Sequence, residues 1–128
     1  MKKVFATMLF LPMIVSAVFM LNAKPPAKAS EVETIELRTE SIDGATHWMP
    51  KELTIKAGKK YKLVAKNDLK SGPAFHGLTI KDFGVQTQVN MGQPFTVELA
   101  PTAAQVGSHD ISCQFHPKHQ QAVLKVVP

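Results

Sequence analysis

Near its C-terminal end the chain carries the stretch Cys113-Gln114-Phe115-His116-Pro117-Lys118-His119. This stretch holds the only cysteine of the sequence and two of its five histidines. A proline is disfavoured inside a helix, so Pro117 predicts a tight loop here rather than a helical face. On a straight strand, residues three apart point to opposite faces, whereas a loop allows Cys113, His116 and His119 to converge on one point.

This combination of side chains predicts a site for a transition metal. Thiolate and imidazole are the ligands that soft and borderline metal ions prefer. Two simpler interpretations stay open at this point. A lone cysteine is often a small buried hydrophobic residue, and histidines are common on protein surfaces.

The N-terminal residues have the pattern of an export signal. A pair of lysines is followed by an almost wholly apolar run over residues 4–21 and by the small-residue motif Ala27-Lys28-Ala29. We therefore expect residues 1–29 to be a signal peptide and short linker, and residues 30–128 to be a mature periplasmic or secreted domain. An uncleaved membrane anchor is the alternative, because the apolar run approaches the length of a spanning helix.

Without the N-terminal segment, the domain is close to neutral. The formal charge is +5, but residues 1–29 hold four lysines and no acid, which leaves 11 basic and 10 acidic residues over 30–128. No basic patch is interleaved with aromatics, so we expect no nucleic-acid partner.

In an oxidising compartment outside the cytoplasm, a single cysteine cannot form an internal disulfide and would be oxidised if left free. A bound metal ion would hold Cys113 as a thiolate.

The rest of the chain predicts short β-strands separated by turn residues, without long helical periodicity. Apolar and mostly polar residues alternate most clearly around Tyr61, Leu63 and Ala65, which predicts a strand with one buried and one mostly solvent-exposed face. The predicted strands are residues 32–38, 52–56, 61–66, 76–80, 85–89, 95–99, 108–113 and 122–127. Seven or eight short strands in roughly 100 residues are typical of an all-β, antiparallel β-sandwich with Greek-key connections.

A further ligand is expected from a neighbouring strand end, because three ligands from one loop leave a metal site half open. The remaining histidines are His47, His76 and His109. His76 opens an apolar strand after a turn-rich segment, so it can lie at the same end of the sandwich as Cys113. Four residues of strand separate His109 from Cys113, about 13 Å, which is too far to share one ion. His76 is favoured, and His47 is interpreted as an ordinary surface residue.

The chain resembles the cupredoxins over about residues 32–128. The matching residues are Trp48-Met49-Pro50-x-x-Leu53-x-Ile55-x-x-Gly58, Asn67, His76 and Cys113-x2-His116. The resemblance implies one copper ion per domain, with His76, Cys113 and His116 as the strong ligands. Gly77 stands where these proteins often carry an asparagine that helps to orient the ligand loop. Glycine permits close backbone approach but supplies no side-chain hydrogen bond.

The sequence departs from the common cupredoxin pattern at the axial ligand. Most members place a methionine there, but this chain has none after Met91, and His119 stands in that position. The loop also looks like that of nitrosocyanin-like red copper proteins, in which a glutamate stands at the position of His76. An imidazole is a stronger, harder donor than a thioether. We therefore expect His119 to favour Cu(II), lower the reduction potential and change the usual intense blue spectrum.

Several functions fit this site. The leading hypothesis is an electron carrier with a redox partner protein, and the main alternative is copper binding or delivery to a transfer partner without redox work. A small catalytic copper site is a weaker alternative, since the sequence suggests no general base or substrate pocket, and a structural zinc site also fits four Cys/His ligands. An apolar rim around His116 is expected from Pro73, Phe75, Phe115 and Pro117, unless these residues are ordinary core.

Overall fold

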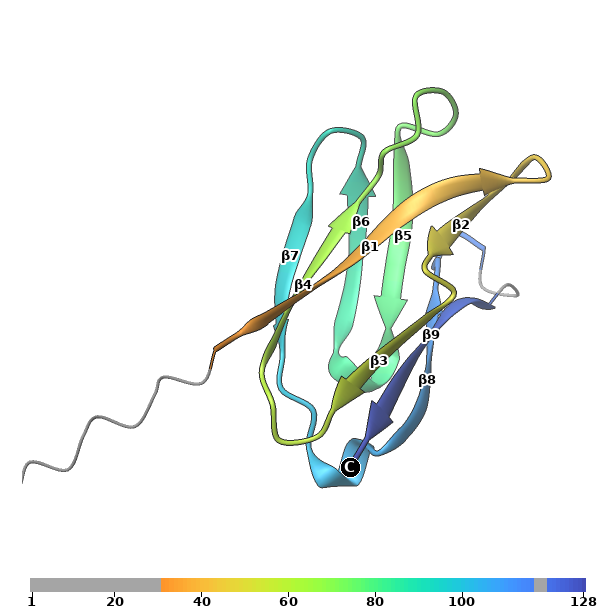
Figure 1. Cartoon of the computed structure of the whole chain (residues 1–128). Coiled ribbons are helices and arrows are strands. Elements are labelled where there is room, and N and C mark those ends of the chain that lie inside the picture. The colour runs from red at the N-terminus through yellow and green to blue at the C-terminus, as the bar shows by residue number, and fades with distance from the viewer. Residues whose placement is uncertain (1–30, 117–119) are drawn as a thin grey trace, which may run out of the picture.

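The computed structural model describes residues 31–116 and 120–128. They form two β-sheets that lie face to face (Figure 1). The first sheet has the order β2-β1-β4-β7, with β1 (Glu33–Ile42), β2 (Ala45–Met49), β4 (Tyr61–Lys66) and β7 (Phe95–Leu99). The second has the order β3-β9-β8-β5-β6, with β3 (Glu52–Lys56), β5 (Phe75–Ile80), β6 (Val85–Asn90), β8 (Gly107–Ser112) and β9 (Gln120–Val127). The predicted β-sandwich is confirmed.

Nine strands lie in the described residues, and one of them, β2, was not predicted. β2 pairs with β1 through a tight turn at Asp43 and Gly44, whose φ angles are 49° and 78°. Two consecutive positive φ angles are what a type I′ hairpin turn needs, and Asp-Gly is a preferred pair for it. Two pairings are parallel, β1 with β4 and β3 with β9, and the other strand pairs are antiparallel.

The core lies between the two sheets. The predicted alternation of β4 is confirmed, because Tyr61, Leu63 and Ala65 are all buried. The fully buried side chains from other strands include Leu37, Trp48, Leu78, Ile80, Ile111 and Leu124. Burial of such a set is the main favourable contribution to folding. Because these side chains come from both sheets, the core fixes how the strand ends face one another.

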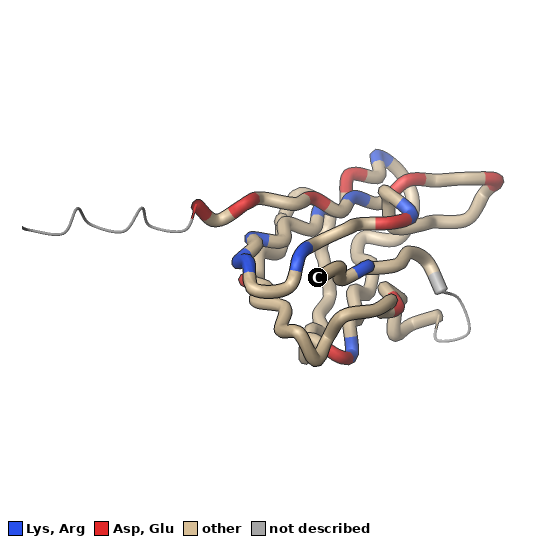
Figure 2. Tube along the Cα trace, turned by 60° about the horizontal axis from the view of Figure 1, so that its bottom comes forward, with Lys and Arg blue, Asp and Glu red and all other residues tan. Residues whose placement is uncertain are grey.

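Charged residues are interspersed along the chain rather than segregated by sign (Figure 2). On the first sheet, Arg38 pairs with Glu40 and Lys66 pairs with Glu36, each at 3.0 Å. These pairs are largely exposed, so each contributes little to stability. Among residues 31–116 and 120–128, no helix has the length and apolarity needed to cross a bilayer.

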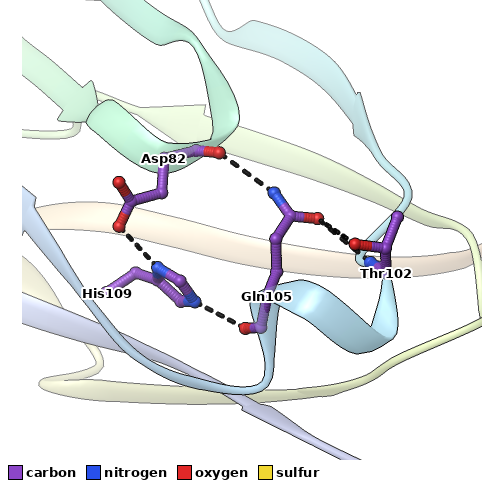
Figure 3. A network of polar contacts seen from close by, with 4 residues as sticks. All are labelled: Asp82, Thr102, Gln105 and His109. Atoms are coloured by element: carbon purple, nitrogen blue, oxygen red, sulfur yellow. Dashed lines mark hydrogen bonds and ion pairs between the residues drawn. The ribbon is translucent and has the colours of Figure 1, made fainter.

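A polar network ties two short 3-10 helices to β8 (Figure 3). The helices are η1 (Lys81–Phe83) and η2 (Ala103–Gln105). His109 Nδ1 lies 2.7 Å from Asp82 Oδ2, and its Nε2 lies 2.7 Å from the Gln105 carbonyl oxygen. Both partners can only accept hydrogen bonds, so only the doubly protonated imidazolium can donate to both. The hydrogen bond to Asp82, followed by that to Gln105, raises the pKa of His109. Both ring nitrogens of His109 are thus engaged by Asp82 and Gln105.

Replacing Asp82 with asparagine should therefore destabilise the protein more in acid than in alkali. Stability contributed by a group with a raised pKa is fully present below its unfolded value of about 6.5 and is lost as pH rises through the folded value. Asp82 is 60% exposed, so solvent screening limits the expected loss to about 1 kcal/mol at pH 5.5. Urea unfolding of the metal-free protein at pH 5.5 and 9 measures this difference. Asp68→Asn is the control, and an equal loss at both pH values would contradict the assignment.

Candidate metal centre

His76 is the second residue of β5 and is only 4% exposed. Its Nε2 lies 2.7 Å from Oε1 of Gln121 in β9, which is also buried. An amide oxygen only accepts hydrogen bonds, so the proton sits on Nε2 and the lone pair on Nδ1 is left for a metal ion. Such a hydrogen bond to the second ring nitrogen is what orients histidine ligands in metal sites. The sequence contains no local signal for this role of Gln121.

Burial lowers the pKa of His76, and the neighbouring rings of His116 and His47 lower it further, while the hydrogen bond to Gln121 opposes these effects. The ordinary value for histidine is about 6.5, so a lowered value leaves the ring neutral at pH 7. A neutral imidazole is the form that binds metal ions. The structure therefore presents His76 in the protonation state that a ligand requires.

Cys113 directly follows β8 and is fully buried. The backbone N–H of Gly77 donates a hydrogen bond to its Sγ over 3.2 Å. The cysteine sulfur is thus held beside the residue that follows His76. Two predicted ligands from distant parts of the sequence, His76 and Cys113, are thereby brought to one end of the second sheet.

His116 lies three residues beyond Cys113 and is exposed. Its backbone N–H donates to the Cys113 carbonyl over 2.9 Å, which closes a tight turn, as Pro117 had suggested for this loop. The rings of His116 and His76 are roughly stacked, with centroids 6.4 Å apart. The structure thus places three of the four predicted ligands, His76, Cys113 and His116, at the same end of the second sheet, while His119 lies outside the described residues.

Within the described residues, no three Cys, His, Asp or Glu side chains are gathered closely enough to hold a metal ion. The chemistry of the donors nevertheless fits a transition metal. It combines a buried sulfur, a neutral imidazole with a free Nδ1 and a second imidazole at the surface. Soft sulfur and borderline nitrogen donors suit copper or zinc rather than calcium or magnesium.

Trp48 supports this site from the first sheet. Its ring lies 5.2 Å from that of His76, and its Nε1–H donates to the Gly77 carbonyl over 2.8 Å. Both backbone groups of Gly77 are therefore engaged, one by Cys113 and the other by Trp48. These contacts fix the start of β5, which carries His76.

A pocket of about 390 Å³ opens beside the two stacked rings and is lined by residues that include His47, Pro73 and Gln121. His47 was predicted to be an ordinary surface residue, but it is partly buried and borders this pocket next to His76 and His116. Within the described part of the chain, its buried Nδ1 has no hydrogen-bond partner. The signal that could have placed it is the Asp43-Gly44 hairpin, which makes β2 a strand of the sandwich.

Two of the residues expected to form an apolar rim around His116, Phe75 and Phe115, lie at the surface. Phe75 and Phe115 are 40% and 48% exposed, and their rings meet edge to face at a centroid distance of 5.1 Å. Pro73 is also exposed, whereas Pro117 lies outside the described residues. The two phenylalanines are therefore surface residues and not part of the core.

The fold is a small two-sheet β-sandwich with His76, Cys113 and His116 at one end of the second sheet. Residues 11–126 match the family described as Cupredoxin-like domain. The chain therefore belongs to the cupredoxin-like domain family. No curated protein sequence matches it significantly.

Solved structures with the same fold are distant in sequence. The copper-exporting P-type ATPase of Streptococcus pneumoniae has a metal-binding domain that is 15% identical, with a TM-score of 0.62 and coverage of 80% of this chain and 92% of that one. Auracyanin from Roseiflexus castenholzii is 19% identical, with a TM-score of 0.57 and coverage of 75% and 98%. A copper-binding protein in its apo form is 21% identical, with a TM-score of 0.56 and coverage of 73% and 86%. At these identities the likeness concerns the fold.

Proposed function

We propose that this chain is an exported mononuclear copper protein that carries electrons. The observation that carries the proposal is the pairing of His76, whose Nδ1 is left free by Gln121, with Cys113, whose sulfur is fixed by Gly77. Copper is the metal that members of this fold bind in the ATPase domain and in the copper-binding protein described above. Bound copper would supply one-electron exchange between Cu(II) and Cu(I).

The burial of each candidate ligand indicates its role in the proposed copper site. His76, Cys113 and His116 would be the strong ligands of one ion, and His119 would be the fourth. Cys113 and His76 are buried and held by hydrogen bonds, so these ligands can keep their positions when the charge of the ion changes. His116 reaches the surface beside Phe75 and Phe115. Electrons would enter and leave through its exposed ring, and the apolar rim would contact a redox partner protein.

The proposal includes the compartment. Residues 1–29 would direct export to the periplasm or beyond, and residues 30–128 would be the working domain. In that oxidising environment a copper ion would protect the single cysteine from oxidation.

A second function, copper delivery without redox work, is favoured by one observation. The pocket beside His76 and His116 has a volume of about 390 Å³. Such a space would allow a ligand of a partner protein to approach the ion from the side. In a delivery protein, copper would leave with the partner instead of cycling in place.

A titration of the purified protein with Cu(II), followed by optical and EPR spectroscopy and voltammetry, tests these proposals. A carrier should show strong thiolate-to-copper charge transfer at one equivalent and a reversible couple. A delivery protein should lose copper rapidly to a competing chelator and give no reversible couple. Stoichiometric Zn(II) binding without a charge-transfer band would contradict both.

His119→Met should move the spectrum towards that of blue copper proteins and raise the reduction potential. A thioether is a weak, soft axial donor that favours Cu(I) relative to an imidazole. Voltammetry and EPR of the copper-loaded protein measure the change. Lys118→Met is the matched control, because it places the same side chain on the neighbouring residue of the loop. Identical spectra for His119→Met and the unsubstituted protein would show that His119 is not a ligand.

A further inference from the structure

Gln114 follows Cys113 and reaches across the second sheet. Its Oε1 accepts a hydrogen bond from Thr79 Oγ1 in β5 over 3.0 Å. Its Nε2 donates to the backbone carbonyl of Thr87 in β6 over 2.8 Å. One side chain therefore connects the loop after β8 to both strands that lie beyond it in the sheet.

Gly77 leaves the space through which this side chain passes. A Cβ atom at Gly77 would overlap the Oε1 and Cδ atoms of Gln114 and would lie 2.9 Å from Cys113 Sγ. The sequence alone suggested that Gly77 supplies no side-chain hydrogen bond towards the ligand loop. In the structure, the side-chain hydrogen bonds come from Gln114 of the loop and end on β5 and β6. Only a glycine at position 77 leaves room for the Gln114 side chain in this position.

We propose that Gln114 is the positioning residue for the cysteine ligand. It holds the segment that begins at Cys113 against β5 and β6, so that the sulfur stays at the N–H of Gly77. This inference rests on the proposed function, because it concerns the geometry of the copper site. The geometry of the copper site would then depend on Gln114, a residue that is not itself a ligand.

The physical argument concerns the freedom of the loop. β5 and β8 are paired at a single position, Thr79 with Ser112. Beyond that point the loop is held by the hydrogen bond to Cys113 Sγ and by the two hydrogen bonds of Gln114. Among the described residues, removing Gln114 leaves the contact of a backbone N–H with sulfur, which is a weak acceptor, and the exposed ring contact of Phe115 with Phe75. The position of Cys113 should then become less well defined.

The test uses metal-free and copper-loaded forms of the full chain. In the metal-free form, hydrogen exchange of the Gly77 amide should become about tenfold faster in Gln114→Ala, since two hydrogen bonds that oppose local opening are lost. In the copper-loaded form, the charge-transfer energy and the EPR hyperfine coupling should change. Gln88→Ala is the matched control, because the side chain of this exposed glutamine of β6 donates to Asn90 and, within the described residues, makes no hydrogen bond to the loop.

Two further variants separate hydrogen bonding from packing. Gln114→Met keeps the length of the side chain without its donor and acceptor, so it should behave like Gln114→Ala. Thr79→Val removes one of the two hydrogen bonds and should give a smaller change in the same direction. These variants also decide the question if Gln114→Ala does not fold.

The outcomes are distinct. Faster Gly77 exchange in both Gln114 variants, with altered copper spectra and an unaffected Gln88→Ala, would support the proposal. Exchange and spectra in Gln114→Met equal to those of the unsubstituted protein would overturn it. If the unsubstituted protein shows no charge-transfer band, the proposed function fails. The exchange measurement would then still decide whether Gln114 positions Cys113.

Discussion

Replacing Trp48 with alanine is expected to lower the free energy of unfolding by about 3–5 kcal/mol. Trp48 is fully buried, and its removal would leave a large cavity between the sheets. It would also leave the Gly77 carbonyl without its donor and the His76 ring without its aromatic neighbour. A loss of this size is a large fraction of the roughly 5–15 kcal/mol by which a domain is usually stable. Urea unfolding of the metal-free protein measures it.

Trp48→Phe separates the two contributions. Phenylalanine keeps most of the apolar volume but cannot donate to Gly77, so the expected loss is about 1–3 kcal/mol for an acceptor left unpaired. If Trp48→Ala cost no more than Trp48→Phe, packing at this position would not contribute to the stability of the sandwich. Because the hydrogen bond ends on the residue after His76, both variants should also disturb the proposed metal site.

The parts of the fold that could be predicted are those encoded locally. The alternation in β4 predicts a strand with one buried and one solvent-exposed face. The Cys-x2-His spacing with Pro117 predicts a turn between two strands. β2 was not predicted, although Asp43-Gly44 marks the hairpin before it. His109 was not expected to be a ligand, because four residues of strand separate it from Cys113. In the structure its ring pairs with Asp82.

The parts that could not be predicted depend on contacts between distant segments. Gln121 meets His76 across 45 residues of sequence, and Gln114 meets Thr79 across 35. Glutamine is common on surfaces, so its type gives no indication of such a role. These contacts arise only when strand order places β9 and β5 on either side of β8. The role of His119 stays a prediction.

Cys113→Ala is expected to abolish the thiolate-to-copper charge-transfer band and to weaken Cu(I) binding by more than a hundredfold. Loss of a residue that merely orients a ligand costs about 10–100-fold in metal affinity, and loss of a ligand should cost more. The thiolate is also the soft donor of the set, so Cu(I) affinity should suffer more than Cu(II) affinity. Competition with a chromophoric Cu(I) chelator measures the change.

Cys113→Ser is the control for folding. Serine has nearly the shape of cysteine and keeps an acceptor for the Gly77 N–H, so the strand end should hold its position. It lacks the sulfur, and the charge-transfer band should still be absent. Cu(I) affinity within about tenfold of the unsubstituted protein in both variants would mean that the thiolate is not a ligand. Because Cys113 is fully buried at the site where Gly77, Gln114 and His76 meet, that result would leave it as a packing residue.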